Sequence, residues 1–395
     1  MNTMQKRIDM TNYIGSRAKS LQISGIRQFF NRVQQYPDAI QLTLGMPDFN
    51  TPDHVKQAAS EAIQNNHTTY TPNAGILTLR TAVSEFLYKK YQLTYNPDDE
   101  VIVTNGASQA IDTALRTILN PGDEVLIPAP VYPAYAPVIQ MAGGNPVLVD
   151  TRNTGFKLTV AQIQAHETDR TKAVILPYPS NPTGVVLSKN ELGELASYLS
   201  GKPYFVVADE IYSELNASGV HHSMANESGM RKQTIVINGV SKSHAMTGWR
   251  IGFLMAPAEI TSEMLKVHQY NVSCASSISQ HAALAAMTDG INDADEMRKA
   301  YSDRRDFMIH SLQDLNMPVT KPDGAFYLFP SISKTGLSSM EFSLKLLEEE
   351  RLAVVPGDAF SYLGEGYIRL SYAYHMDELN EGMKRLQAFW KRINQ

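Results

Sequence analysis

The chain has 395 residues, of which 43% are hydrophobic, and this length suggests two packed domains. A formal net charge of −5 argues against a general nucleic-acid-binding or anionic-membrane surface. The single cysteine, Cys274, excludes an intrachain disulfide and a cysteine metal cluster. We find no signal-like apolar run near Met1 and no run long enough to span a bilayer, so we expect a cytoplasmic protein without a membrane or nucleic-acid partner.

The pattern of the first hundred residues predicts two helices and one short strand. Apolar residues at helical spacing indicate a helix over residues 23–36, and residues 40–44 read as a strand that ends at Gly45. The segment Thr51-Pro52-Asp53 is typical of a helix start, with the threonine as N-cap and the proline at the first helical position.

The middle of the chain alternates short apolar runs with helical stretches. Strands that are buried on both faces and separated by helices predict a mostly parallel α/β sheet. Ligands of such sheets bind outside the carboxyl ends of the strands, so the residues that follow each strand are the candidates. The predicted strands cover residues 101–104, 124–127, 146–149, 173–176, 205–208, 235–237 and 251–255.

Beyond Met255, a long helical stretch reaches about residue 288 and is followed by an α+β tail. We expect helices there at 293–315 and 339–349 and short strands at 325–329, 352–355 and 367–371. The sequence thus predicts a large domain over 46–288, a smaller α+β domain over 289–395, and a segment 1–45 that packs with the small domain.

Lys242 stands between Ser241 and Ser243, directly after an apolar strand. An amine held in a desolvated pocket loses affinity for its proton and becomes a nucleophile able to form a Schiff base with an aldehyde. Arg250 offers a planar fork suited to phosphate, and an aldehyde that also carries a phosphate is pyridoxal 5'-phosphate. Taken alone, the stretch is better interpreted as a lysine and an arginine that cap a core strand, because short motifs often match by chance.

Other strand ends carry polar residues as well. The segment Gly106-Ala107-Ser108 opens a helix whose free N–H groups are a ready anion site. Asn181 lies in a proline-rich loop and is either a rigid ligand or a turn asparagine. Asp209 ends a buried strand, where a protonated pyridine nitrogen or an N-cap role would compensate its burial. Arg369 lies in an apolar strand and needs a carboxylate from substrate or protein.

The joint order of these motifs resembles class I aminotransferases of the fold-type I pyridoxal-phosphate superfamily, over nearly the whole chain. The resemblance implies a mostly parallel sheet sandwiched by helices, with a smaller α+β domain. It rests on Tyr70-Thr71-Pro72-Asn73-Ala74-Gly75, Asn181-Pro182-Thr183-Gly184, Asp209-Glu210-Ile211-Tyr212, Ser241-Lys242, Gly248, Arg250, Gly252 and Arg369. More narrowly, Ile23-Ser24-Gly25-Ile26-Arg27 and Val240-Ser241-Lys242-Ser243-His244 look like the bacterial aminotransferase A group, which is associated with N-acetyl-LL-diaminopimelate aminotransferase activity.

The resemblance also implies catalytic roles. Lys242 would bind the cofactor covalently and then act as the base that moves the substrate proton. Asp209 would keep the pyridine nitrogen protonated, and Asn181 and Tyr212 would hydrogen-bond the phenolic oxygen of the cofactor.

For the rest of the cofactor, the resemblance assigns Tyr132 to the ring, although Tyr135 is close enough in sequence to remain an alternative. The matching Tyr70 would reach the phosphate of a neighbouring subunit, which implies a homodimer with shared sites. The phosphate ligands within one subunit would be Gly106, Ala107, Ser108, Ser241 and Arg250.

The substrate α-carboxylate would be bound by Arg369, with the Gly45 backbone and Asn181 beside it. Dicarboxylate-specific relatives add a basic residue, whereas this chain has Ser108 at one matching position and no basic residue over 269–273. Arg27 is a candidate for binding a distal carboxylate, or is a solvated arginine.

The resulting prediction is a ping-pong aminotransferase for an L-amino acid and a 2-oxo acid such as 2-oxoglutarate, without a metal. N-acetyl-LL-2,6-diaminopimelate, a precursor of lysine and peptidoglycan, is the expected donor. The alternatives are a broad-specificity aromatic or aspartate aminotransferase and a carbon-sulfur β-lyase, which would use the same lysine chemistry. A cofactor-sensing regulator is disfavoured, because the enzyme-like pattern begins within the first few dozen residues.

Overall fold

A computed structural model describes residues 9–21 and 25–394, without the side chains of 26–28. Its centre is a seven-stranded sheet in the order β2-β8-β7-β6-β5-β3-β4. Only β8 runs antiparallel to its neighbours, so the sheet is mostly parallel as predicted. The strands are β2 (Val101–Thr104), β3 (Glu124–Ala129), β4 (Asn145–Asp150), β5 (Thr171–Leu176), β6 (Phe205–Asp209), β7 (Thr234–Gly239) and β8 (Gly252–Met255).

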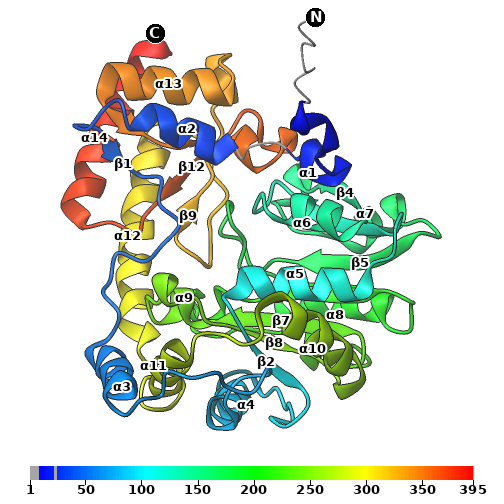
Figure 1. Cartoon of the computed structure of the whole chain (residues 1–395). Helices are drawn as coiled ribbons and strands as arrows, with labels where there is room; N and C mark the ends of the chain where they lie inside the picture. Colours follow the sequence, from blue (N-terminus) through cyan, green and yellow to red (C-terminus); the bar gives the residue numbers. More distant parts are fainter. Residues whose placement is uncertain (1–8, 22–24, 395) are drawn as a thin grey trace, which may run out of the picture.

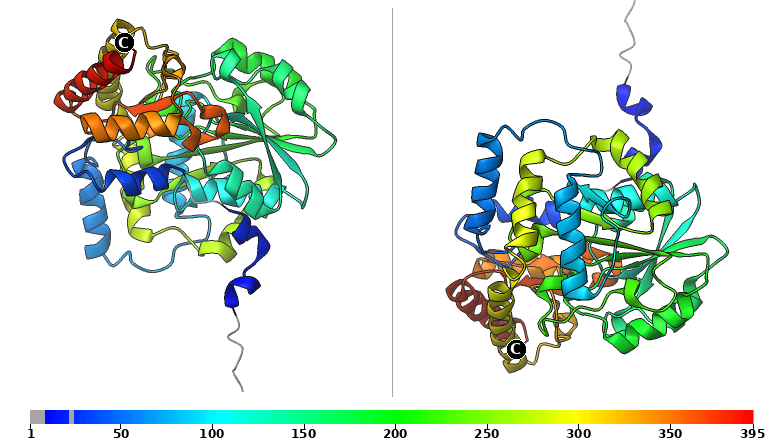
Figure 2. Two further views of the ribbon diagram at one scale, coloured as in Figure 1. Left: turned by 90° about the horizontal axis from the view of Figure 1, so that it is seen from above. Right: turned by 90° about the horizontal axis from the view of Figure 1, so that it is seen from below.

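Helices cover both faces of this sheet (Figures 1 and 2) because successive strand residues point to opposite sides. Val207 packs with the cluster that contains Ile111 and Met264, whereas its neighbour Val206 packs with Leu195 on the other face. The helices around the sheet are α3 (Asp53–Gln64), α4 (Leu77–Tyr91), α5 (Ala107–Ile118), α6 (Tyr135–Ala142), α7 (Val160–His166), α8 (Lys189–Leu199), α10 (Ala258–Val272) and α11 (Ser277–Thr288).

The C-terminal part builds a second core around a small antiparallel sheet in the order β11-β12-β9. Its helices bury Phe342, Phe389 and Trp390 in one cluster with the strand residues Leu328 and Leu370. These elements are α12 (Ala294–Asp314), β9 (Tyr327–Leu328), α13 (Ser339–Glu350), β11 (Val355–Pro356), β12 (Ile368–Ser371) and α14 (Met376–Ile393).

The N-terminal segment is shared between the two parts. Strand β1 (Ile40–Gln41) pairs with β10 (Leu352–Ala353), and α2 (Gly25–Val33) packs Phe29 and Val33 against Leu347. Helix α1 (Ser16–Ser20) instead lies against α6, where Arg17 Nη1 donates to Met141 O at 3.4 Å. Residues 16–20 therefore differ from the expected packing with the small domain, because this polar helix buries no side chain.

Two other expectations about local structure are wrong. The helical stretch predicted to reach residue 288 is broken at Ser273, whose φ of +62° interrupts the helix between α10 and α11. The N-cap of α3 is Pro52, and Thr51 Oγ1 makes no cap bond but donates to Ala245 O at 2.8 Å. Thr51 is therefore used for a long-range contact that a local sequence pattern does not reveal.

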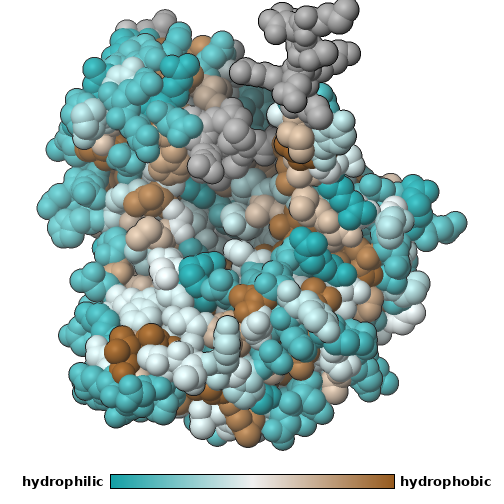
Figure 3. All heavy atoms as spheres, viewed as in Figure 1, coloured by the Kyte–Doolittle hydropathy of each residue, from teal (hydrophilic) through white to brown (hydrophobic). Residues whose placement is uncertain are grey.

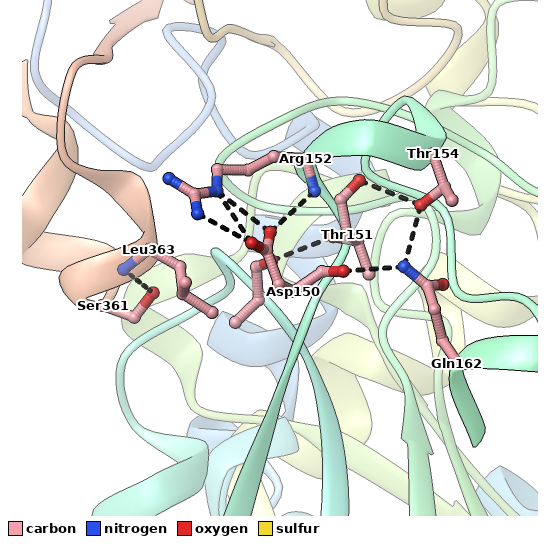
Figure 4. A network of polar contacts seen from close by, with 8 residues as sticks. Asp150, Thr151, Arg152, Thr154, Gln162, Ser361 and Leu363 are labelled. Carbon is pink, nitrogen blue, oxygen red and sulfur yellow. Dashed lines mark hydrogen bonds and ion pairs between the residues drawn. The ribbon is translucent and has the colours of Figure 1, made fainter. Parts of the chain in front are cut away.

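The end of the edge strand β4 is tied down by a polar network (Figure 4). Arg152 Nε lies 3.0 and 3.1 Å from the two carboxylate oxygens of Asp150. Gln162 Nε2 donates to Asp150 O at 2.7 Å and to Thr154 Oγ1 at 3.2 Å. Thr151 Oγ1 donates to Ala129 O on β3 at 2.9 Å, so the network secures the last register position of this strand.

The surface of the view in Figure 3 is largely hydrophilic, with apolar residues in scattered groups. Among the described helices, none is long and apolar enough to cross a membrane. The described residues also contain no cluster of three or more His, Cys, Asp or Glu side chains able to hold a metal ion.

Candidate active site

A cavity of about 490 Å³ lies at the carboxyl ends of β5, β6 and β7, between the large sheet and β12. This is the position expected for a ligand site in an open α/β sheet. The structure brings most of the predicted site residues together in its wall: Gly45, Ala107, Ser108, Tyr132, Asn181, Asp209, Tyr212, Ser241, Lys242, Arg250 and Arg369.

Lys242 projects into the cavity from α9 (Val240–Ser243), a single helical turn that follows β7. Its Nζ donates to Gly45 O at 2.5 Å. Burial, together with the positive charges of Arg369 and Arg250, lowers the pKa of the lysine to about 8, and Asp209 opposes this shift. A lysine with this pKa supplies a far larger fraction of neutral, nucleophilic amine at neutral pH than a solvated lysine does.

Asp209 ends β6 with a side chain that is only 5% exposed. Tyr135 Oη donates to its Oδ2 at 2.6 Å, and Ile211 N donates to its Oδ1 at 3.2 Å. Burial raises the pKa of Asp209, against the effect of the Tyr135 hydrogen bond. No Lys, Arg or His in the described part of the chain forms an ion pair with it, so a protonated nitrogen of a ligand suits this carboxylate.

The two tyrosines of the 132–135 segment have different environments. Tyr135 is 2% exposed and its hydroxyl is occupied by Asp209. Tyr132 is partly buried in the cavity wall, with its ring edge-on to Tyr135 at a centroid distance of 5.6 Å. The arrangement favours Tyr132 as the ring that stacks on a planar ligand, and Tyr135 as the residue that positions Asp209.

One end of the cavity is suited to an anion. The first N–H groups of α5 have no intrahelical partner, and Ala107 and Ser108 line the cavity there. Gly106 does not line the cavity but has a φ of +79°, and a Cβ on it would collide with the Arg250 guanidinium. A Cβ on Gly252 would collide with the backbone of 106–107. These glycines let the helix start and the arginine approach each other closely.

Arg369 reaches the cavity from β12 and is only 3% exposed. Its Nη1 donates to Asn181 Oδ1 at 3.0 Å and its Nη2 to Thr43 O at 2.5 Å. Both acceptors are neutral, and burial lowers the pKa of the guanidinium. Among the residues that the structure describes, none makes a hydrogen bond with its buried Nε. A buried arginine with a free N–H is suited to a carboxylate ligand.

Sequence reasoning missed two tyrosines. Tyr327 on β9 shares a hydrogen bond with Tyr212 at 2.8 Å between hydroxyls, and its ring lies under Arg369, 4.4 Å from the guanidinium carbon. Tyr374 Oη accepts a hydrogen bond from Leu44 N at 2.9 Å and thereby holds the backbone segment directly before Gly45 in place. In a sequence, an aromatic residue in or just after a short strand looks like a core residue. No local signal therefore identifies Tyr327 and Tyr374 as residues of the site.

Besides Gly106, one described residue of the prediction does not line the cavity: Tyr70, which is 90% exposed. The backbone of Arg27 belongs to α2, but its side chain lies outside the described part of the structure. Its proposed contact with a distal carboxylate therefore stays a prediction.

Taken together, the cavity offers an amine of lowered pKa and a helix start suited to an anion. It also contains a buried carboxylate and a buried arginine Nε for which the described part of the chain supplies no ionic or hydrogen-bond partner, respectively. These groups fit pyridoxal 5'-phosphate: Lys242 matches the aldehyde, Asp209 the ring nitrogen, and α5 with Arg250 the phosphate. Arg369 remains for the carboxylate of a substrate.

Comparison with known proteins agrees with this fit. Residues 37–386 match the family model of aminotransferase class I and II. A probable N-acetyl-LL-diaminopimelate aminotransferase of Bacillus subtilis is 55% identical over 96% of each chain, and an aspartate aminotransferase of Pyrococcus abyssi is 42% identical over 97% of each. The solved aromatic aminotransferase of Pyrococcus horikoshii superposes with a TM-score of 0.88 at 42% identity, over 92% of this chain and 99% of that one.

Proposed function

The chain belongs to the class I and II aminotransferases, which are pyridoxal-phosphate enzymes, and on this premise we propose that it transfers the amino group of N-acetyl-LL-2,6-diaminopimelate to 2-oxoglutarate. The observation that carries the transaminase reaction is the cavity in which Lys242, Asp209 and Arg369 converge. The donor is inferred from the 55% identical Bacillus relative.

The residues divide the work of transamination. The cofactor, when bound, supplies an aldehyde and a ring that accepts the electron pair left on the substrate. Arg369 binds the α-carboxylate through its free Nε, and its contact with Asn181 fixes the orientation of the guanidinium. Lys242 Nζ would take the proton from the substrate Cα and deliver it to the former aldehyde carbon of the cofactor, and in the reverse half-reaction it would move the proton back. Asp209 would keep a proton on the ring nitrogen of the cofactor, because its buried carboxylate favours a cationic partner.

Tyr212 and Asn181 line the cavity and would hydrogen-bond the ring oxygen of the cofactor, while Tyr132 would stack on its ring. We also propose a homodimer in which Tyr70 of one subunit completes the phosphate site of the other. The support is the 90% exposure of its side chain, together with the 88% exposure of Tyr270, which makes two large aromatic side chains available on the surface. A large exposed aromatic side chain is typical of an interface.

The cavity wall disfavours a short dicarboxylate as the preferred donor. Its cations among the described side chains are Lys242, Arg250 and Arg369, each of which already has a role. An aromatic donor is the second candidate, because Phe30, Leu44 and Ile111 add apolar surface to the wall. The similarity to a solved structure that is named an aromatic aminotransferase also supports an aromatic donor.

The decisive experiment follows the spectrum of the bound cofactor when purified enzyme is mixed with one amino donor at a time. Glutamate should convert the cofactor to its amino form, and 2-oxoglutarate should reverse the change, as a ping-pong reaction requires. A preference for N-acetyl-LL-diaminopimelate over phenylalanine and aspartate would support the proposed donor. A preference for phenylalanine would contradict it and identify an aromatic aminotransferase. Release of pyruvate from cysteine-like substrates without any conversion would establish a lyase instead.

A further inference from the structure

The helical turn that carries Lys242 is too short to fix its own position. Helix α9 has four residues, and a single turn of helix is not stable without outside contacts. Its C-terminal flank adds strain, because Ala245 has a φ of +50° and Arg250 a φ of +55°. Contacts from elsewhere in the chain must therefore hold the lysine in place.

One such contact is His244, which is 1% exposed. Its Nε2 lies 2.9 Å from Gly290 O and its Nδ1 lies 2.7 Å from Ser243 Oγ. Since a carbonyl oxygen can only accept, Nε2 carries a hydrogen. Burial lowers the pKa of His244, so at neutral pH the imidazole is neutral, and its Nδ1 then accepts from the Ser243 hydroxyl.

Gly290 lies where α11 passes into α12. Its carbonyl also accepts from Asp293 N at 2.9 Å, and Asp293 is the residue directly before α12. The charged and titratable groups that face His244 are Asp293, which pairs with His54 at 3.3 Å, and the more distant Glu214. His244 therefore ties the turn of Lys242 to the first residues of α12.

The acceptor of the lysine is tied to the same helix. Lys242 Nζ donates to Gly45 O, and three residues later Asp48 contacts α12. Arg304 Nη1 lies 2.9 Å from both carboxylate oxygens of Asp48, and Tyr301 Oη donates to Oδ1 at 3.1 Å. The side chain of Arg304 is 12% exposed and that of Asp48 is 23% exposed, so this ion pair is partly shielded from solvent.

We propose that α12 positions the Lys242 amine against the Gly45 carbonyl, with His244 and Arg304 as the two positioning residues. Figure 1 shows α12 leaving α11, passing α9 and β9, and reaching α13 and α14. The proposal rests on the proposed function only in taking Lys242 as the reactive amine. Misplacing a reacting group by about 1 Å can cost about a hundredfold in rate, so loss of either contact should be visible.

The test measures the amine in protein freed of cofactor, independently of turnover. Pyridoxal, which lacks the phosphate, is captured by Lys242 and fixed with borohydride, and the modified peptide is quantified by mass spectrometry. The variants are His244→Phe, His244→Gln, Arg304→Met and the double variant His244→Phe/Arg304→Met. Matched controls on α12 are Arg298→Met, whose ion pair with Asp295 stays within the helix, and the exposed His310→Phe.

We expect capture to slow about tenfold in His244→Phe and several-fold in Arg304→Met, while both controls match the wild type. His244→Gln should recover most of the rate, because its amide can still donate to Gly290 O. The double variant should be less impaired than the product of the single effects, as expected for contacts that act through one element.

Wild-type rates in both single variants would overturn the proposal, and so would fully multiplicative effects, since the two contacts would then act separately. If His244→Phe fails to fold, Arg304→Met and His244→Gln still decide the question. Failure of the wild type itself to capture pyridoxal at Lys242 would instead contradict the proposed function, so the two failures are distinguishable.

Discussion

Two arginines near the carboxyl edge of the large sheet have opposite surroundings. Arg152 is paired with Asp150 by hydrogen bonds, is 36% exposed, and has a raised pKa mainly because of that hydrogen-bonded carboxylate. Arg369 is 3% exposed, contacts only neutral acceptors and has a pKa that burial lowers. The first arrangement is complete within the chain. The second lowers the folding free energy that is gained, because Arg369 is buried without an anionic partner among the described residues.

The two aspartates differ in the same sense. Hydrogen bonding to Arg152 lowers the pKa of Asp150, whereas burial raises the pKa of Asp209. A polar group whose hydrogen bonds and ion pairs are all made within the chain contributes to the structure. A buried polar group that lacks such a partner is a candidate for binding a ligand. Substitutions can test whether the Asp150–Arg152 pair is structural and the cavity groups are functional.

The largest expected effect is that of Lys242→Ala. Removal of the only amine that lines the cavity, among the described side chains, should abolish turnover and borohydride-fixed incorporation of the cofactor. Activity assays and mass spectrometry of the reduced protein measure both. An adduct that survives at the same yield in the variant would show that another lysine holds the cofactor.

Asp209→Asn should lower kcat by about two to three orders of magnitude, because the ring nitrogen loses its buried charge partner. The matched substitution Asp150→Asn should leave kcat unchanged, since Asp150 pairs only with groups of its own network. Steady-state kinetics of both variants provide the comparison. Equal effects on kcat would remove the distinction between the two carboxylates.

Arg369→Ala should lower kcat/KM by at least about a hundredfold for the amino donor and for the oxo acid alike. The loss should lie mainly in KM, because the guanidinium binds the carboxylate that both substrates share. Saturation curves for the two substrates measure it. Unchanged KM values for both would exclude Arg369 as their ligand.

The reactivity of Lys242 should depend on pH with a midpoint near its pKa of about 8. Only the neutral amine attacks an aldehyde, so capture of pyridoxal by cofactor-free protein should rise with pH and level off above that value. In Arg369→Ala a like charge is removed, the pKa rises, and the midpoint should move upward. A midpoint near that of a solvated lysine in the wild type would contradict the effect of burial.

The smallest effect is expected for Arg152→Ala. A partly exposed ion pair contributes about 0.2–1 kcal/mol, so unfolding in urea should reveal at most that loss of stability. Turnover should not change, in contrast to Arg369→Ala. A large fall in kcat would mean that the edge network also acts on the site.

Local patterns predicted the parallel sheet well, because continuous apolar runs and helical spacing mark buried strands and their covering helices. They also located the residues that follow the strands, such as Lys242 and Asp209, where topology fixes the position. They could not reveal contacts such as Thr51 with Ala245 or His244 with Gly290, whose partners are far away in sequence. The position of Tyr327 in the site was not predicted for the same reason, since only the packing of the folded chain distinguishes it from a core aromatic residue.

The bond between Arg369 and Thr43 joins residues that are 326 positions apart. Closing so long a loop is slow compared with forming helices or neighbouring strands. During synthesis or refolding, the substrate site is therefore completed only after both ends of the chain have come together. We therefore expect substrate binding to recover later in refolding than the helices and the large sheet do, and a fragment that ends before β12 to lack the substrate site.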